Sequence, residues 1–165
     1  MVTEPDHNAI IDRIIEIFKA DSSLWNTDGS KIRSFTNGRV IAPLPYPYCF
    51  IYFESEDDKP FEAVTVGGAP AFMSQTSSYH KFIYNIVVVT NKKTSETGEQ
   101  DINSWVKLIK QRLKSNVDLR KPSDGTDAKV KVTHPIRTRQ KSGTAPNGEI
   151  VAGAVITFQL EAATV

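Results

Sequence analysis

The chain of 165 residues contains a single cysteine, no excess of charge of either sign and no long apolar run. One cysteine excludes an intramolecular disulfide and a metal site built from several thiolates. Because Cys49 stands in an apolar segment, we expect a buried structural thiol. The balance of 20 Lys and Arg against 19 Asp and Glu lacks the basic excess that is typical of a nucleic-acid binder.

Signals for a membrane or for secretion are also missing. No stretch approaches the ~18 consecutive apolar residues of a membrane-spanning helix, so we expect no membrane partner. Residues 1–6 are acidic and lack the apolar core of a secretory signal. We therefore expect the chain to mature in a reducing cytoplasm.

Catalytic and cofactor motifs are absent from the sequence. The histidines His7, His80 and His134 lie far apart and form no pair with zinc-ligand spacing. There is no nucleophile elbow and no glycine-rich phosphate loop. The acidic triplet 56–58 lacks the further ligands of a calcium loop, so we expect a solvated turn there. We predict no catalytic residue, no cofactor and no metal, although spacing alone leaves open an enzyme whose residues meet only in the fold.

What the sequence does contain is one long strand, predicted over Tyr79–Thr90. Most of its residues are β-branched or aromatic, and none is Gly or Pro. One face carries Phe82, Tyr84, Ile86 and Val88, and the other carries Ile83, Val87 and Val89. A strand that is apolar on both sides is covered on both sides, by a helix, a second sheet or another subunit.

Two amphipathic helices are predicted, one before and one after this strand in the sequence. The first runs from Pro5 to about Lys19, with Thr3 or Glu4 as its cap. The second runs from about Gly98 to Lys114, and residues 97–100 fit a capping box. Each has an apolar stripe at three- and four-residue spacing that predicts packing on a sheet.

Shorter strands complete the pattern. We expect strands over 48–54 and 61–66 with a turn at 56–60, a short hairpin joining 32–35 to 39–41, and a long closing hairpin from 128–137 and 149–161. The prediction is an α+β fold in one domain, residues 1–165. Its mostly antiparallel twisted sheet is flanked by two main helices and ends in a long C-terminal β-hairpin. Flexible segments are expected near 67–78, 115–127 and 138–148.

Two groups of residues are candidates for contact with other molecules. Arg137, Arg139 and Lys141 lie on the predicted hairpin tip, where they can contact phosphates without reading bases. A solvated loop and a hairpin that inserts into a neighbouring subunit are the alternatives. Phe72 and Met73 lie in a polar loop and either fold back on the core or form a subunit interface.

The order of elements resembles the tail-terminator proteins of long-tailed bacteriophages, also called tail-completion or neck proteins. The residues that carry this order are Ile10–Phe18, Tyr48–Glu54, His80–Thr90, Ile102–Leu113 and Ala152–Glu161. The likeness covers most of the chain but rests on element order, not on a signature motif. The three prolines between 43 and 47 and the loop 67–78 depart from it.

The resemblance implies a structural subunit that forms a ring, typically hexameric, which terminates the tail tube and joins it to the head. It implies copies of itself, tail-tube proteins and head-connector proteins as partners, and a place in the tail or neck of the virion after assembly in the host cytoplasm. Arg137, Arg139 and Lys141 would then be lumen residues, with non-specific DNA contact. The family has no catalytic residue to carry over. The alternative function is a nucleic-acid-contacting α+β module that uses the same three cations.

Overall fold

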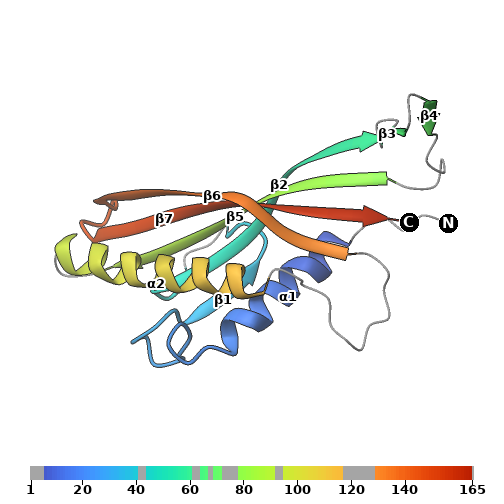
Figure 1. Ribbon diagram of the computed structural model, residues 1–165. Coiled ribbons are helices and arrows are strands. Elements are labelled where there is room, and N and C mark those ends of the chain that lie inside the picture. The colour runs from blue at the N-terminus through green and yellow to red at the C-terminus, as the bar shows by residue number, and fades with distance from the viewer. Residues whose placement is uncertain are drawn as a thin grey trace.

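The computed structural model describes residues 6–40, 44–60, 64–66, 69–71, 78–91, 95–116 and 129–164. The elements, in chain order, are α1 (His7–Lys19), β1 (Ser34–Asn37), β2 (Tyr48–Pro60), β3 (Val64–Val66), β4 (Ala69–Ala71), β5 (Ser78–Asn91), α2 (Ser95–Ser115), β6 (Lys129–Thr144) and β7 (Ile150–Thr164). Figure 1 shows how they are arranged. The predicted α+β class with two main helices is confirmed.

The centre of the fold is a five-stranded mixed sheet in the order β1-β2-β5-β7-β6. Strand β5 pairs antiparallel with β2 on one side and with β7 on the other. Strand β6 pairs antiparallel with β7, and β1 pairs parallel with β2. A separate two-stranded sheet is formed by β3 and β4. The long predicted strand is therefore the middle strand of the sheet.

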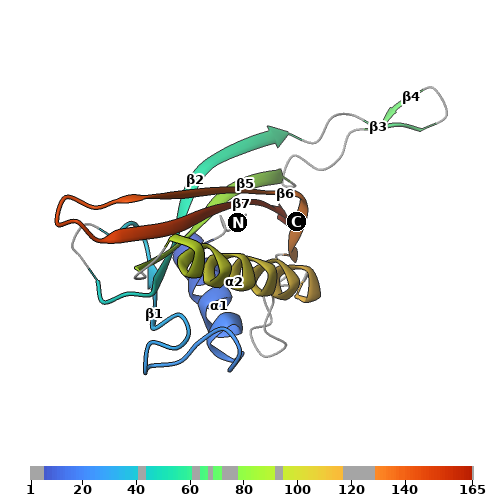
Figure 2. The same cartoon turned by 90° about the vertical axis from the view of Figure 1, so that its left-hand side faces the viewer.

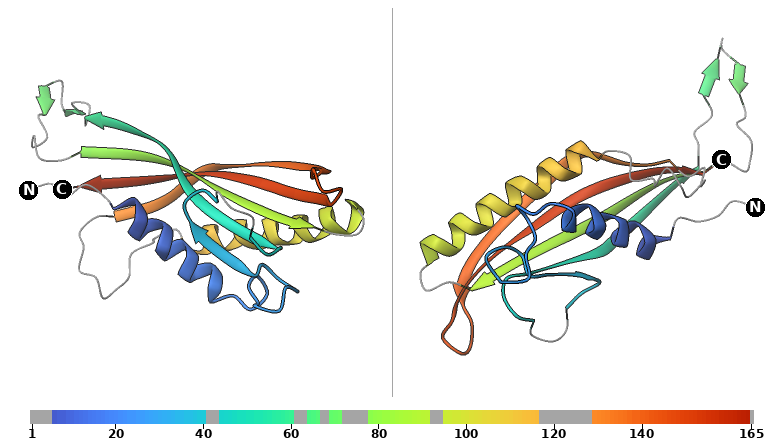
Figure 3. Two further views of the ribbon diagram at one scale, coloured as in Figure 1. Left: turned by 180° about the vertical axis from the view of Figure 1, so that it is seen from behind. Right: turned by 90° about the horizontal axis from the view of Figure 1, so that it is seen from below.

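Both helices lie on the same face of the sheet. Figures 1 and 2 show α1 and α2 together below the strands, and the view from below in Figure 3 has both helices in front of them. Polar contacts agree, since His7 of α1 meets Tyr84 of β5, and Glu99 of α2 accepts a hydrogen bond from Ser142 of β6. The core fills the space between the helices and this face of the sheet. It includes Ile14, Phe18, Ile86, Ile109 and Phe158, all of which are almost fully buried.

Local chemistry explains where α1 begins. The side chain of Asp6 accepts hydrogen bonds from the backbone N–H groups of Asn8 and Ala9, at 2.9 and 3.3 Å. The prediction that Thr3 or Glu4 caps this helix is wrong, because the carboxylate of Asp6 reaches the free N–H groups first. Helix α2 begins at Ser95, so Thr97 and Gly98 lie inside its first turn, and the predicted capping box is wrong.

Two further local predictions are wrong. Residues 32–35 form no hairpin with the described residues 39 and 40 of the predicted partner segment, because β1 pairs parallel with Tyr48–Ile51, which lets Phe35 bury its ring on the core side. Residues 56–60 are not a turn but the second half of β2. In the register with β5, Asp57 lies opposite Lys81, so a segment whose acidic composition is typical of a turn is held in the sheet by its pairing with β5.

Candidate functional site

The face of the sheet away from the helices is not covered by another of the described elements. We call it the open face. Its residues are Tyr48, Phe50 and Tyr52 on β2; Ile83, Asn85, Val87 and Val89 on β5; Val151, Gly153, Val155, Thr157 and Gln159 on β7; and Arg137, Arg139 and Lys141 on β6. Apart from buried Asn85 and the three exposed cations, these residues are half-buried. The sequence predicted that both faces of β5 are covered. Within the described part, only the face on which the helices pack is covered.

An aromatic ladder forms one side of the open face. The rings of Tyr48 and Phe50 stack with centroids 6.4 Å apart, and those of Phe50 and Tyr52 stack at 6.1 Å. Burial, and then the neighbouring Tyr46, raise the pKa of the Tyr48 hydroxyl. The ladder presents aromatic surface that its own neighbours cover only in part, and partly exposed aromatic rings are typical of interfaces.

Aliphatic side chains continue the ladder across the sheet. In register, Phe50 lies opposite Val87 and Val87 lies opposite Val155. Cross-strand neighbours of this kind stand about 5 Å apart, so the three side chains form one continuous apolar strip. A contiguous apolar patch with a polar rim marks a contact site for another molecule.

A polar cluster interrupts the apolar strip at Asn85. This side chain is buried, donates to Glu54 at 3.0 Å and accepts from Thr157 at 2.6 Å. Arg39 lies 3.6 Å from the Glu54 carboxylate and stacks its guanidinium 4.4 Å from the centre of the Tyr52 ring. The carboxylate and the amide are thus satisfied within the chain, so the cluster acts as structural support and not as a free ligand site.

Three cations form a row along β6. Arg137 lies opposite Thr157, Arg139 opposite Val155 and Lys141 opposite Gly153, so all three stand on the open face. They are exposed and lie about 7 Å apart along the strand. The predicted flexible tip at 138–148 is shorter than expected, because β6 continues to Thr144 and only 145–149 form the turn. The cation row is therefore held on a strand, not on a loop.

Strands β2 and β6 each have a backbone edge without a strand partner in the described part. Strand β1 pairs only with Tyr48–Ile51, so β2 from Tyr52 to Pro60 pairs with β5 alone. At the other side, β6 pairs with β7 alone. Edges of this kind present unpaired N–H and C=O groups, which makes them templates for another strand.

The three histidines lie on three different elements. His7 accepts or donates a hydrogen bond with the Tyr84 hydroxyl at 2.6 Å, stacks on Phe53 at 4.0 Å and lies 3.7 Å from a Glu56 oxygen. It docks the start of α1 on the core side of the sheet. His80 lies in β5 and His134 in β6. No group of three or more His, Cys, Asp or Glu that could hold a metal ion occurs among the residues that the structure covers.

The other predicted site lies outside the described residues, since Phe72 and Met73 fall between 71 and 78. Among the described helices, none is long and apolar enough to cross a membrane. Cys49 is buried as predicted, and burial raises the pKa of its thiol. The sequence pattern missed that the open face exists, because alternation in β5 marks two apolar faces without showing that both helices pack on the same one.

Comparison with protein-family models and with curated proteins finds no match to this chain.

Proposed function

We propose that the chain is a structural subunit of a phage or phage-like tail, which assembles with copies of itself into a ring that terminates the tail tube and joins it to the head or neck. The open face carries this proposal. Half-exposed Phe50, Val87 and Val155 form a strip that a self-sufficient single domain would bury.

The order of the elements supports the tail assignment. A helix, four strands, a long central strand, a second helix and two long closing strands follow one another, and this order resembles that of the tail-terminator family. The proposal gives the chain no catalytic chemistry, no cofactor and no metal. Its partners are copies of itself, tail-tube proteins and head-connector proteins, and its place is the tail or neck of the virion. The long C-terminal hairpin of that family corresponds here to β6 and β7.

The test measures assembly and tube capping together. Light scattering coupled to size-exclusion chromatography and negative-stain imaging should show a ring at high protein concentration. Addition to polymerising tail-tube protein should limit tube length. A chain that neither oligomerises nor caps tubes overturns the proposal.

A matched pair of variants ties the result to the open face. Val87→Glu adds one negative charge on the open face, and Gln111→Glu adds the same charge at an exposed position of α2. Because Val87 is only half-buried, both variants should fold. We expect Val87→Glu alone to lose assembly or capping, and equal behaviour of the two variants would contradict the role of this face.

A second function is supported by the cation row. Arg137, Arg139 and Lys141 are exposed, share one face and form no ion pair with another described residue. Such a row fits a nucleic-acid backbone. Duplex DNA binding that falls steeply with salt and is lost in Arg137→Ala plus Arg139→Ala would favour a nucleic-acid-contacting module. The formal net charge of +1 makes this the second candidate.

A further inference from the structure

The outer edges of β2 and β6 carry charges of opposite sign. Strand β6 (Lys129–Thr144) contains five Lys and Arg residues and no Asp or Glu. The unpaired part of β2 contains four acidic residues, Glu54, Glu56, Asp57 and Asp58, and one lysine. We call these two segments the basic edge and the acidic edge. They lie on opposite sides of the sheet, because β5 and β7 stand between them.

The backbone at both edges is available for pairing within the described part. The acidic edge, from Tyr52 to Pro60, pairs only with β5, and the basic edge pairs only with β7. The positions of two prolines are compatible with β2 and β6 having free edges. Pro60 is the last residue of β2, and Pro135 falls in the irregular stretch between Thr133 and Arg137. Proline is tolerated at sheet edges and at bulges, where no ladder hydrogen bond is lost.

The directions of the strands fit a continuous sheet. Neighbouring strands from β2 through β5 and β7 to β6 are antiparallel at each step, so β2 and β6 run in opposite directions. When two copies stand side by side in the same orientation, β6 of one copy is antiparallel to β2 of the next. This contact joins two different surfaces, which is the heterologous type that closes into a ring.

Charge selects this contact over the symmetric ones. Two basic edges, or two acidic edges, would place like charges opposite each other, which destabilises strand pairing. Lysine on an edge strand is a known guard against aggregation. Here the cations of β6 disfavour pairing with a second basic edge but are compatible with pairing to an acidic edge.

We propose that the basic edge of one copy pairs with the acidic edge of the next copy, so that the sheet continues from subunit to subunit around the ring. This inference rests on the self-assembly in the proposed function and adds a second contact between copies to the one on the open face. The partner is a second copy of this chain. This pairing forms backbone hydrogen bonds between the two strands and places opposite charges along their contact.

The test reverses the charge of each edge separately. The segment of β6 that stands level with the acidic edge in this arrangement is Lys129–Arg137, which contains three cations. Lys131→Glu plus Arg137→Glu makes this segment acidic, and Asp57→Lys plus Asp58→Lys makes the acidic edge basic. Glu54 and Glu56 are left unchanged because they contact Asn85 and His7 within the chain. As a matched control, Lys107→Glu plus Lys114→Glu introduces the same change of charge on exposed positions of α2.

The expected result is a loss in each variant and a recovery in their mixture. Each edge variant alone should stay monomeric by light scattering at a concentration at which the wild type and the α2 control assemble. An equimolar mixture should assemble again, because each copy then finds an edge of opposite sign on the other variant. Circular dichroism checks that all variants are folded.

Other outcomes separate the failures. If the wild type assembles and both edge variants assemble equally well alone, edge pairing is overturned while the ring stands. If the wild type never self-associates, edge pairing is overturned, and the proposed function fails with it when the chain also does not cap tubes. If assembly is unchanged but Lys131→Glu plus Arg137→Glu abolishes binding to duplex DNA, the basic edge is a nucleic-acid contact and edge pairing is overturned.

Discussion

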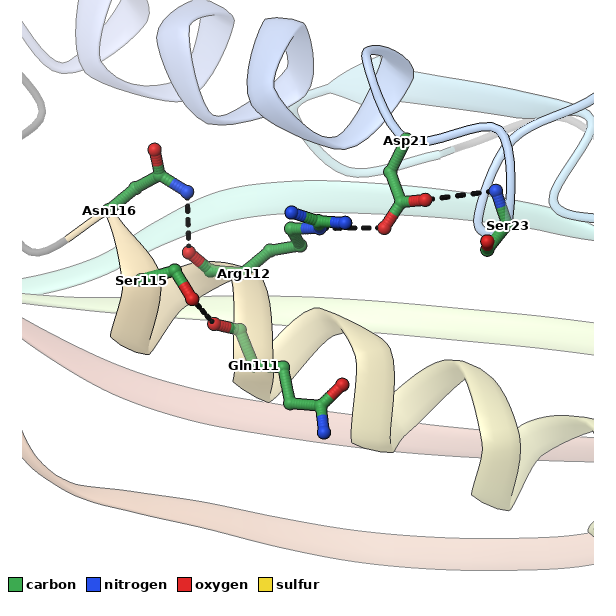
Figure 4. Close-up of polar contacts among 6 residues, drawn as sticks. All are labelled: Asp21, Ser23, Gln111, Arg112, Ser115 and Asn116. Carbon is green, nitrogen blue, oxygen red and sulfur yellow. Dashed lines mark hydrogen bonds and ion pairs between the residues drawn. The ribbon is translucent and has the colours of Figure 1, made fainter.

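The guanidinium of Arg112 donates from Nε to the Oδ2 atom of Asp21 at 2.6 Å, and this pair fastens the turn after α1 to the second helix (Figure 4). The other oxygen of Asp21 accepts the backbone N–H of Ser23 at 2.9 Å. The carboxylate is almost fully buried, whereas the arginine is close to half exposed. The two residues are far apart in the sequence, so this contact links the first third of the fold to α2.

Removal of the arginine should destabilise the protein more than removal of the carboxylate charge. Arg112→Ala leaves a buried carboxylate without its strongest partner, and we expect a loss of about 2 kcal/mol in the free energy of unfolding. Asp21→Asn keeps an acceptor for Ser23 and should cost less. Urea unfolding measures both, and a smaller loss in Arg112→Ala would contradict this account.

The same pair predicts an acid dependence of stability. Burial alone would raise the pKa of Asp21, but hydrogen bonds from Arg112 and Ser23, with the charge of Arg112, lower it below the ordinary 3.8. A carboxylate whose pKa is lowered in the folded state stabilises the fold above its unfolded pKa, and this contribution is lost as the pH falls below 3.8 toward the folded pKa. Unfolding curves between about pH 6 and about pH 2 should therefore show a smaller loss of stability in acid for Asp21→Asn than for the wild type.

The polar cluster on the open face predicts non-additive substitutions. Asn85→Ala removes the partners of Glu54 and Thr157 at once, and we expect a cost of about 1–3 kcal/mol. Thr157→Val alone removes one hydrogen bond and should cost about 1 kcal/mol. In the double variant the two costs should not add, because they share one contact. Full additivity in chemical denaturation would mean that the hydrogen bond between these side chains contributes nothing.

Neighbouring positions on β5 distinguish the two faces of the sheet. Ile86 is fully buried on the helix side, and Ile86→Ala should cost about 2–5 kcal/mol. Val87 is half-buried on the open face, so Val87→Ala should cost about 1 kcal/mol or less in the monomer. Thermal or urea unfolding at low protein concentration gives both values. A large cost at Val87 in the monomer would show that the open face is covered within the chain.

Cys49 provides a reporter of unfolding. The thiol is fully buried, and burial raises its pKa, so little thiolate forms and reagents cannot reach it in the folded state. We expect labelling by a thiol reagent at neutral pH to proceed only as fast as the protein opens. Fast labelling of the folded protein, compared with an unfolded control in urea, would contradict the burial of this strand.

Periodicity predicted the strands and helices whose pattern is set by one buried face. The stripe of α1 and the alternation of β5 both follow from side chains that pack on the same core, and local sequence records that packing directly. The second half of β2 was missed because its acidic residues are typical of a turn, and only the register with β5 supplies Lys81 opposite Asp57. The parallel pairing of β1 was missed for the same reason, since it depends on a partner strand that comes later in the chain.

The site was predicted in part. Arg137, Arg139 and Lys141 were singled out as a group, and the register of β6 and β7 does place them on one face. Their role as part of an edge could not be predicted, because strand order is a property of the whole sheet. Asn85 gave only a weak signal, one amide in an apolar run, and its partners Glu54 and Thr157 lie far from it in sequence.

The position of β7 between β5 and β6 has a consequence for how the chain folds during synthesis. All other strands of the main sheet precede β7 in the sequence, yet β7 fills the gap between two of them. Until the residues of β7 leave the ribosome, one edge of β5 is unpaired and β6 has no partner strand. Nascent chains therefore expose strand edges that can pair incorrectly. Arrested chains that stop before Ile150 should therefore be protease-sensitive and bound by chaperones, and protection should arrive late and in one step.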